Sequence, residues 1–133
     1  MSAFRYAWAL FLAAVCLTTT AAADLGTLKN SGGGITVAVT PVNLSVGADS
    51  WEFKIVLDTH TKDLGDDLMK SVLLLDGTGG KHVPTGWDGA GSGGHHREGV
   101  LRFKPVSPRP QVIELRITRP GESESRSFRW QLN

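Results

Sequence analysis

The sequence predicts an all-β protein: an antiparallel, immunoglobulin-like β-sandwich of six to seven short strands with no disulfide. Apolar and polar residues alternate over several stretches, which is the period of a strand with one buried face. Turns rich in glycine, proline and aspartate separate these stretches, and no segment keeps helical spacing with a cap at each end. Cys16 is the single cysteine, so an intramolecular disulfide is excluded. A small barrel is the alternative fold.

The expected strands begin in the N-terminal half. Residues 35–40 alternate isoleucine and valine with threonine and alanine, and Pro41 is expected to end the strand. Residues 51–58 show the clearest alternation, with an aromatic-rich buried face. Residues 72–75 form a short apolar run, closed by an Asp-Gly turn.

Three further strands are expected in the C-terminal half, at 100–103, 112–118 and 128–132. The first of them places Leu101 and Phe103 on one face, and the other two alternate in the same way. Each is bounded by a proline or a cluster of turn residues, as short antiparallel strands usually are.

Two weaker elements complete the expected architecture. Residues 82–87 predict a seventh strand, placed at a sheet edge because Pro84 cannot donate a ladder hydrogen bond. Asp63–Met69 is long enough for one helical turn, but Gly65 argues against a longer helix.

Residues 1–23 have the features of a secretory signal peptide. Ala7–Leu17 is an apolar run of the length expected for its h-region, short for a bilayer span. Alanines at 21–23 supply the small residues of a cleavage site, so the mature chain is expected to begin at Asp24. We therefore expect a periplasmic or secreted protein with one domain, residues 24–133, and no membrane span after cleavage.

The charged residues are unevenly distributed along the chain. Residues 24–96 carry nine acids and five bases, whereas 97–133 carry four acids and eight bases. We expect the two halves to interleave as neighbouring strands, so that opposite charges meet. The formal net charge is only +1, and no concentrated basic surface is apparent, which argues against nucleic-acid binding.

A glycine-rich run, GWDGAGSGGHHREGV at residues 86–100, is the most unusual stretch. Gly89, Gly91 and Gly94 satisfy the G-x-G-x-x-G pattern, but a strand is expected after them. The dinucleotide fingerprint needs a helix there, because the helix N-terminus meets the phosphates. The preferred interpretation is a hairpin loop, followed by a metal site, and last a phosphate loop.

The histidines suggest the metal site. His82 precedes the glycine run, and His95 and His96 follow it, so a long hairpin of 82–87 with 95–103 would bring them together. His60 is a possible fourth ligand if its loop reaches the same end. Imidazoles are typical ligands of zinc and copper(II).

Other groups could join or replace these histidines as ligands. Asp88 or Glu98 could complete the site, and Met69 is the soft ligand available to copper(I). Aspartates at 58, 63, 66 and 67 could hold calcium, although the D-x-D-x-D-G spacing of a calcium loop is absent.

Catalysis is not expected. A Ser92, His95 and Asp88 set is available for hydrolytic chemistry, but nothing in a glycine-rich loop visibly holds these side chains in place. The sequence also offers no sign of a confined cleft. We therefore predict that the protein is not an enzyme.

Three stretches resemble a group of short secreted bacterial domains of unknown function. These are WEFKIVLDTH at 51–60, GGHHREGVLRFKP at 93–105 and RSFRWQL at 126–132. The likeness covers about residues 35–132. It implies a bacterial exported protein, and it supplies no activity and no site residues.

The predicted function is an exported, non-catalytic binding module whose functional end carries residues 82–98. One version is a periplasmic zinc or copper domain that uses the histidines. The other is an interaction or structural domain of the cell envelope that binds another envelope protein and no metal. In that version Trp87 and Arg97 are surface anchors, residue types that are favoured at hot spots.

Overall fold

The computed structural model describes residues 25–132 and contains nine strands and one short helix within that range. The predicted signal peptide and Cys16 lie outside the described residues. The elements are β1 (Leu28–Gly32), β2 (Ile35–Asn43), β3 (Trp51–Thr59), α1 (Leu68–Ser71), β4 (Val72–Leu75), β5 (Lys81–His82), β6 (Gly86–Gly89), β7 (His96–Phe103), β8 (Val112–Ile117) and β9 (Arg126–Gln131).

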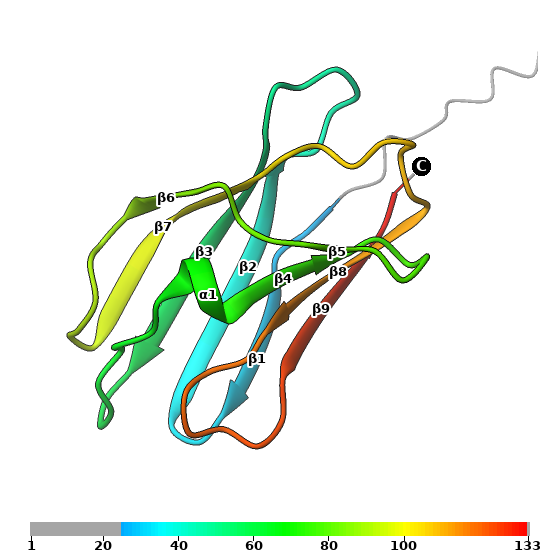
Figure 1. The fold of residues 1–133 in the computed structure, drawn as a ribbon. Coiled ribbons are helices and arrows are strands. Elements are labelled where there is room, and N and C mark those ends of the chain that lie inside the picture. The colour runs from blue at the N-terminus through cyan, green and yellow to red at the C-terminus, as the bar shows by residue number, and fades with distance from the viewer. Residues whose placement is uncertain (1–24, 133) are drawn as a thin grey trace, which may run out of the picture.

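The strands form two antiparallel sheets packed face to face (Figure 1), which confirms the predicted all-β sandwich. One sheet has the order β1-β2-β3-β7-β6 and is called the five-stranded sheet below. The other has the order β5-β4-β8-β9 and is called the four-stranded sheet. The immunoglobulin-like topology stays a prediction. No helix in residues 25–132 is long and apolar enough to cross a membrane.

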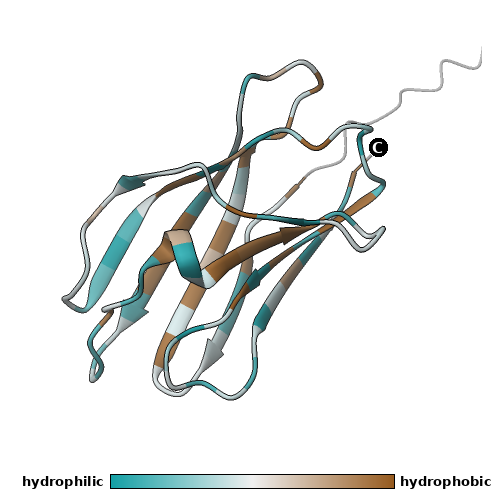
Figure 2. Ribbon diagram, viewed as in Figure 1, coloured by the Kyte–Doolittle hydropathy of each residue, from teal (hydrophilic) through white to brown (hydrophobic). Residues whose placement is uncertain are grey.

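The core consists of the inward-facing residue of each alternating pair, as the period-two pattern predicts. Figure 2 shows the resulting hydrophobic bands along β2, β3 and β4. Phe53 lies at the centre of the core, where its ring meets Phe103 edge-on and Trp130 at a tilt, each with a centroid distance of 5.7 Å. Phe53 and Phe103 belong to the five-stranded sheet and Trp130 to the four-stranded sheet, so the contact of Phe53 with Trp130 joins the two sheets.

The strands differ from the predicted six to seven in three places, two of which raise the count to nine. The strand β1 was missed because its sequence, LKNSG, is mostly polar and lies at a sheet edge, exposed over four of its five residues. Pro41 does not end β2: the strand continues through a register shift between Pro41 and Asn43. The predicted strand 82–87 is two strands, since β5 pairs with β4 whereas β6 pairs with β7.

Two further boundaries differ from the prediction. The strand β7 begins at His96 instead of Val100, so the two histidines lie at its start. The helical turn is α1, which begins later than the predicted Asp63 because Asp67 caps it by accepting a hydrogen bond from Met69 N at 3.0 Å.

The acidic and basic halves of the chain do interleave, as expected. Lys54 of β3 pairs with Glu98 of β7 at 2.7 Å. In the interior, Asp66 receives two hydrogen bonds of 2.7 Å from Nε and Nη2 of Arg119. Asp66 is 1% exposed and Arg119 6%, so this ion pair is excluded from water.

The buried pair gives a stability prediction. Asp66→Asn leaves the Arg119 charge buried without its counter-ion, so we expect a loss of about 3–5 kcal/mol in the free energy of unfolding. Urea denaturation followed by circular dichroism measures this loss. Asp67→Asn is the matched control, because its side chain is exposed and asparagine also caps helices. Equal stability of the two variants would contradict the assignment.

Candidate binding site at the glycine-rich loop

The loop between β6 and β7 is held in place by its neighbours. Gly93 N donates to Leu64 O at 2.9 Å, and Leu64 N donates to Gly94 O at 3.2 Å. Gly94 N also donates to the Asp63 carboxylate at 3.0 Å. The φ angles of Gly93 and Gly94, 101° and 79°, lie in the region that favours glycine. The loop is therefore a docked segment, at the same end of the sandwich as the loop that follows β3 (Figure 1).

Trp87 lies over a pair of facing glycines, Gly89 in β6 and Gly99 in β7. A Cβ on Gly99 would come within 2.7 Å of the indole, and one on Gly89 within 2.8 Å. Residues 89 and 99 must therefore both be glycine for the indole to lie this close to the two strands. The indole Nε1 donates to Ala90 O at 3.0 Å, which orients the ring.

Arg97 occupies the same inner face of β7, and its side chain is buried, with 3% of the residue exposed. The prediction that it is a surface anchor is therefore wrong. Nη1 donates to Asp66 O at 2.6 Å and to Leu64 O at 3.2 Å, and Nη2 donates to Ala90 O at 3.2 Å. The guanidinium carbon lies 5.9 Å from the centroid of the Trp87 ring, a cation–π distance.

A cavity of about 230 Å³ lies beside Trp87 and Arg97. Residues 66–69 line one side of it, and Gly91 and Ser92 of the glycine-rich loop line another. We call it the Trp87 cavity. Its wall combines an aromatic ring, the half-exposed thioether of Met69 and a buried cation, which are complementary to a small ligand with one apolar and one polar part.

The histidines do not gather around one point. His82 belongs to β5 in the four-stranded sheet, where it is paired with Leu74. His96 belongs to β7 in the five-stranded sheet, and Figure 1 places β5 far from the β6–β7 loop. The predicted hairpin is therefore formed only in part: Gly86 and Trp87 of β6 pair with β7, whereas His82 pairs in the other sheet and lies outside the hairpin. Within residues 25–132, no group of three or more His, Cys, Asp or Glu side chains is placed to hold a metal ion.

Each of these two histidines has a carboxylate partner of its own. His82 Nε2 lies 3.0 Å from Asp76 Oδ2, and this hydrogen bond is the main reason that the pKa of Asp76 lies well below its usual range. His96 Nδ1 lies 2.5 Å from Asp58 Oδ1, and its Nε2 lies 3.3 Å from Glu98 Oε2. Both ring nitrogens of His96 are thus occupied.

His60 follows the end of β3 and His95 precedes the start of β7. Both are exposed loop residues. His95 contributes its backbone carbonyl, which accepts from Thr59 N at 2.9 Å. A four-histidine metal site stays a prediction that this arrangement does not support.

The aspartates considered for calcium have separate partners as well. Asp63 holds the Gly94 amide, Asp66 binds Arg119, and Asp67 caps α1. Asp88, considered for a catalytic set with Ser92 and His95, forms an ion pair with Arg102 on the outer face of the five-stranded sheet.

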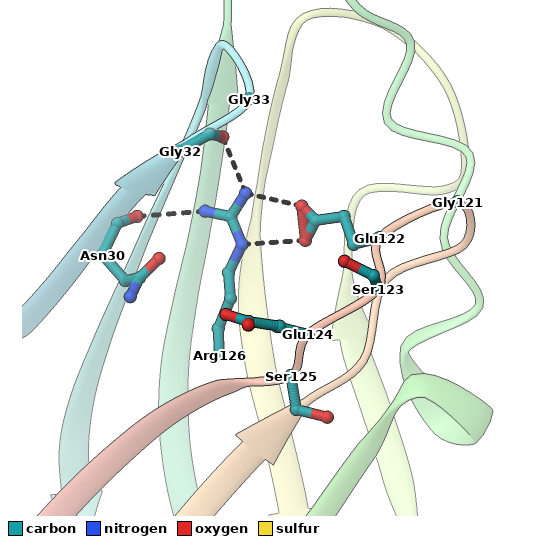
Figure 3. A pocket seen from close by; sticks show the side chains of 9 residues that line it. All are labelled: Asn30, Gly32, Gly33, Gly121, Glu122, Ser123, Glu124, Ser125 and Arg126. Atoms are coloured by element: carbon teal, nitrogen blue, oxygen red, sulfur yellow. Dashed lines mark hydrogen bonds and ion pairs between the residues drawn. The ribbon is translucent and has the colours of Figure 1, made fainter.

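A second cavity, of about 410 Å³, lies between the β1–β2 turn and the β8–β9 loop (Figure 3). Arg126 forms its floor and is bound on both sides. Nε and Nη2 hold the Glu122 carboxylate at 2.9 and 2.8 Å, while the other N–H groups donate to the carbonyls of Asn30, Gly32 and Ile35. All five donors are used, so this arginine joins the two sheets and has no free group for a ligand.

Comparison with known proteins adds no relatives. No family model matches the chain, no curated protein matches it, and no solved structure matches it. The resemblance to secreted bacterial domains therefore stays a prediction.

The sequence does carry a signal for the buried position of Arg97. Leu101 and Phe103 were placed on the inner face, and the same alternation, continued towards the N-terminus, places Gly99 and Arg97 there too. Asp66 and Arg119 carried no comparable signal, because their pairing depends on two loops that are distant in sequence.

The packing of Trp87 on Gly89 and Gly99, called the glycine bed below, gives a second prediction. Gly99→Ala should displace the indole and destabilise the protein by roughly 1–3 kcal/mol, because the added methyl group overlaps the ring and the Asp88 carbonyl. The Trp87 indole resonance in NMR spectra and urea denaturation measure the two effects. Gly91→Ala is the matched control, since nothing lies within 4 Å of a Cβ there. An unshifted indole resonance in Gly99→Ala would contradict this packing.

The carboxylates around His96 give a third prediction. The hydrogen bond that the Asp58 carboxylate accepts from His96, followed by the one that Glu98 accepts, raises the pKa of His96 above its usual value. A raised folded-state pKa contributes stability that is complete below the unfolded pKa of about 6.5 and is lost as the pH rises through the folded pKa. The stability difference between wild type and His96→Gln should therefore shrink as the pH rises from about 5.5 to 9.

Denaturation of both proteins across this pH range checks the prediction, and the His96 ring resonances give the pKa directly. His95→Gln is the control, because His95 acts through a backbone carbonyl that the substitution keeps. A stability difference that stays constant with pH would show that His96 is not held as a cation by Asp58 and Glu98.

Proposed function

We propose that this chain is an exported, non-catalytic binding module of the periplasm or cell surface that binds its ligand at the Trp87 cavity. The observation that carries the proposal is the combination of a docked glycine-rich loop and an oriented aromatic ring. Functional loops on a rigid sandwich bind best when their conformation is already formed, because less entropy is lost on binding.

The local contacts support a preformed site. Trp87 is held by the Ala90 carbonyl and by the glycine bed, and Arg97 is held by three backbone carbonyls. Small-molecule sites typically combine an apolar wall with a few oriented polar groups. Another envelope protein remains a possible ligand within this proposal. Trp87 would then contact the partner, and Arg97 would hold the Trp87 ring in place through its cation–π contact.

The proposal is tested by screening small aromatic and aliphatic fragments with ¹⁵N-labelled protein. Binding fragments should shift the Trp87 indole and the amides of 66–69 and 91–97. Met69→Ala should weaken binding and Trp87→Leu should weaken it by about tenfold, because anchoring aromatics dominate such sites. Val83→Ala is the control, since Val83 is an exposed apolar residue outside the cavity lining.

Two outcomes would reject the proposal. Fragments that shift only other surfaces, such as residues 30–33 and 121–126, would place the binding site in the larger cavity. Sub-micromolar zinc binding that shifts His82, His95 and His96 together would favour the metal version instead.

A further inference from the structure

Residues 25–132 contain three buried arginines, and they differ in one respect. Arg119 and Arg126 each present Nε and Nη2 to a carboxylate, which is Asp66 in the first case and Glu122 in the second. Arg97, the most deeply buried of the three, donates only to backbone carbonyls. Within the described part of the chain, no carboxylate forms an ion pair with it, and its Nε has no hydrogen-bond partner.

An arginine in this state is an incompletely compensated charge. Three carbonyl oxygens and the face of the Trp87 ring offset part of the cost of removing it from water. Two of its five N–H groups remain, Nε–H and one of the Nη2 pair. These nitrogens form the same edge with which Arg119 and Arg126 hold carboxylates in a bidentate manner.

Arg97 also lines the Trp87 cavity. Nε itself is closed to solvent, so a ligand reaches this edge only if the cavity wall opens slightly. The loop hydrogen bonds are made by Ala90, Gly93 and Gly94, which leaves Gly91 and Ser92 between these anchors as the exposed part of the wall. Gly91 has no side chain, and no atom lies within 4 Å of the position its Cβ would take, so this part of the wall is loosely packed.

Each of the two acidic residues in the wall has a cationic neighbour of its own. Asp66 is bound by Arg119 through two hydrogen bonds. Asp67 accepts from Met69 N and lies 3.9 Å from Lys70 Nζ. Of the charged residues in the wall, Arg97 is therefore the one without an oppositely charged partner. Its positive charge favours an anionic ligand.

We propose that the Trp87 cavity binds a small apolar carboxylate, whose carboxyl group takes the Nε–Nη2 edge of Arg97 and whose apolar part packs on Trp87 and Met69. This inference rests on the proposed binding function and names its ligand class. The cavity volume of about 230 Å³ suits a ligand of roughly the size of one substituted ring. A planar ring suits the indole face and the Met69 thioether.

The test compares phenylacetate with phenylacetamide, which has the same shape and no charge. Titration of the ¹⁵N-labelled protein should give a dissociation constant about tenfold lower for phenylacetate, since hydrogen bonds to charged groups are worth this factor or more. Phenylacetate should also shift the Arg97 Nε–H resonance, whereas both ligands should shift the Trp87 indole.

Two surface variants keep the test independent of the stability of Arg97 variants. Met69→Glu adds a negative charge at the exposed side of the cavity and should remove the preference for phenylacetate over phenylacetamide. Met69→Gln is the matched neutral control and should keep that preference. Arg97→Lys, where it folds, should lose the preference as well, because lysine has no bidentate edge.

The outcomes separate this inference from the proposed function. Equal affinity for the two ligands, with shifts at Trp87, would overturn the carboxylate inference and leave the binding cavity standing. Phenylacetate shifts confined to other arginines would also overturn it. If neither ligand nor any other fragment shifts residues 66–69, 87 or 91–97, both proposals fail.

Discussion

The contacts of Asp66 determine how the end of the sandwich that carries the Trp87 cavity is built. Its carboxylate accepts two hydrogen bonds from Arg119, which lies just after β8 of the four-stranded sheet. Its backbone carbonyl accepts a hydrogen bond from Arg97 of β7 in the five-stranded sheet. One loop residue thereby joins the two sheets at the corner beside β6. The position of α1, which Asp67 caps, and the position of the glycine-rich loop, which docks on Leu64, both depend on this connection. Without it, the Trp87 cavity would lose the side formed by residues 66–69.

Buried arginines perform here a task that disulfides often perform in small exported domains. Arg126 connects the β1–β2 turn to the β8–β9 loop, and Arg119 connects the loop after β8 to the loop before α1. Each uses its planar fork to satisfy several acceptors from separate segments at once. Buried ion pairs contribute little net stability when compared with apolar packing, but a misplaced partner is costly, so such contacts restrict how the sheets can pack.

The extent to which the sequence predicts this structure follows from the range of the forces involved. Strands such as 51–58 and 112–118 are predictable because the alternation of apolar and polar residues within each segment shows which face is buried. The split between β5 and β6 was not, because the change of sheet depends on pairing with partners far along the chain. The same limit applies to the site. Adjacent residues such as His95 and His96 suggested a shared ligand, although consecutive residues entering a strand point apart.

The contrast between Arg126 and Arg97 also explains why the cavity at Arg126, although larger than the Trp87 cavity, is not the favoured site. A guanidinium that already holds a carboxylate and three carbonyls has no donor left, so a ligand beside it would have to displace existing bonds to gain any. Arg97 starts from a less favourable state, in which part of its desolvation cost is not recovered. A ligand that completes its hydrogen bonds therefore gains free energy that the folded protein alone does not supply. The volume of a cavity does not reveal this difference between the two arginines, whereas the hydrogen bonds of each guanidinium do.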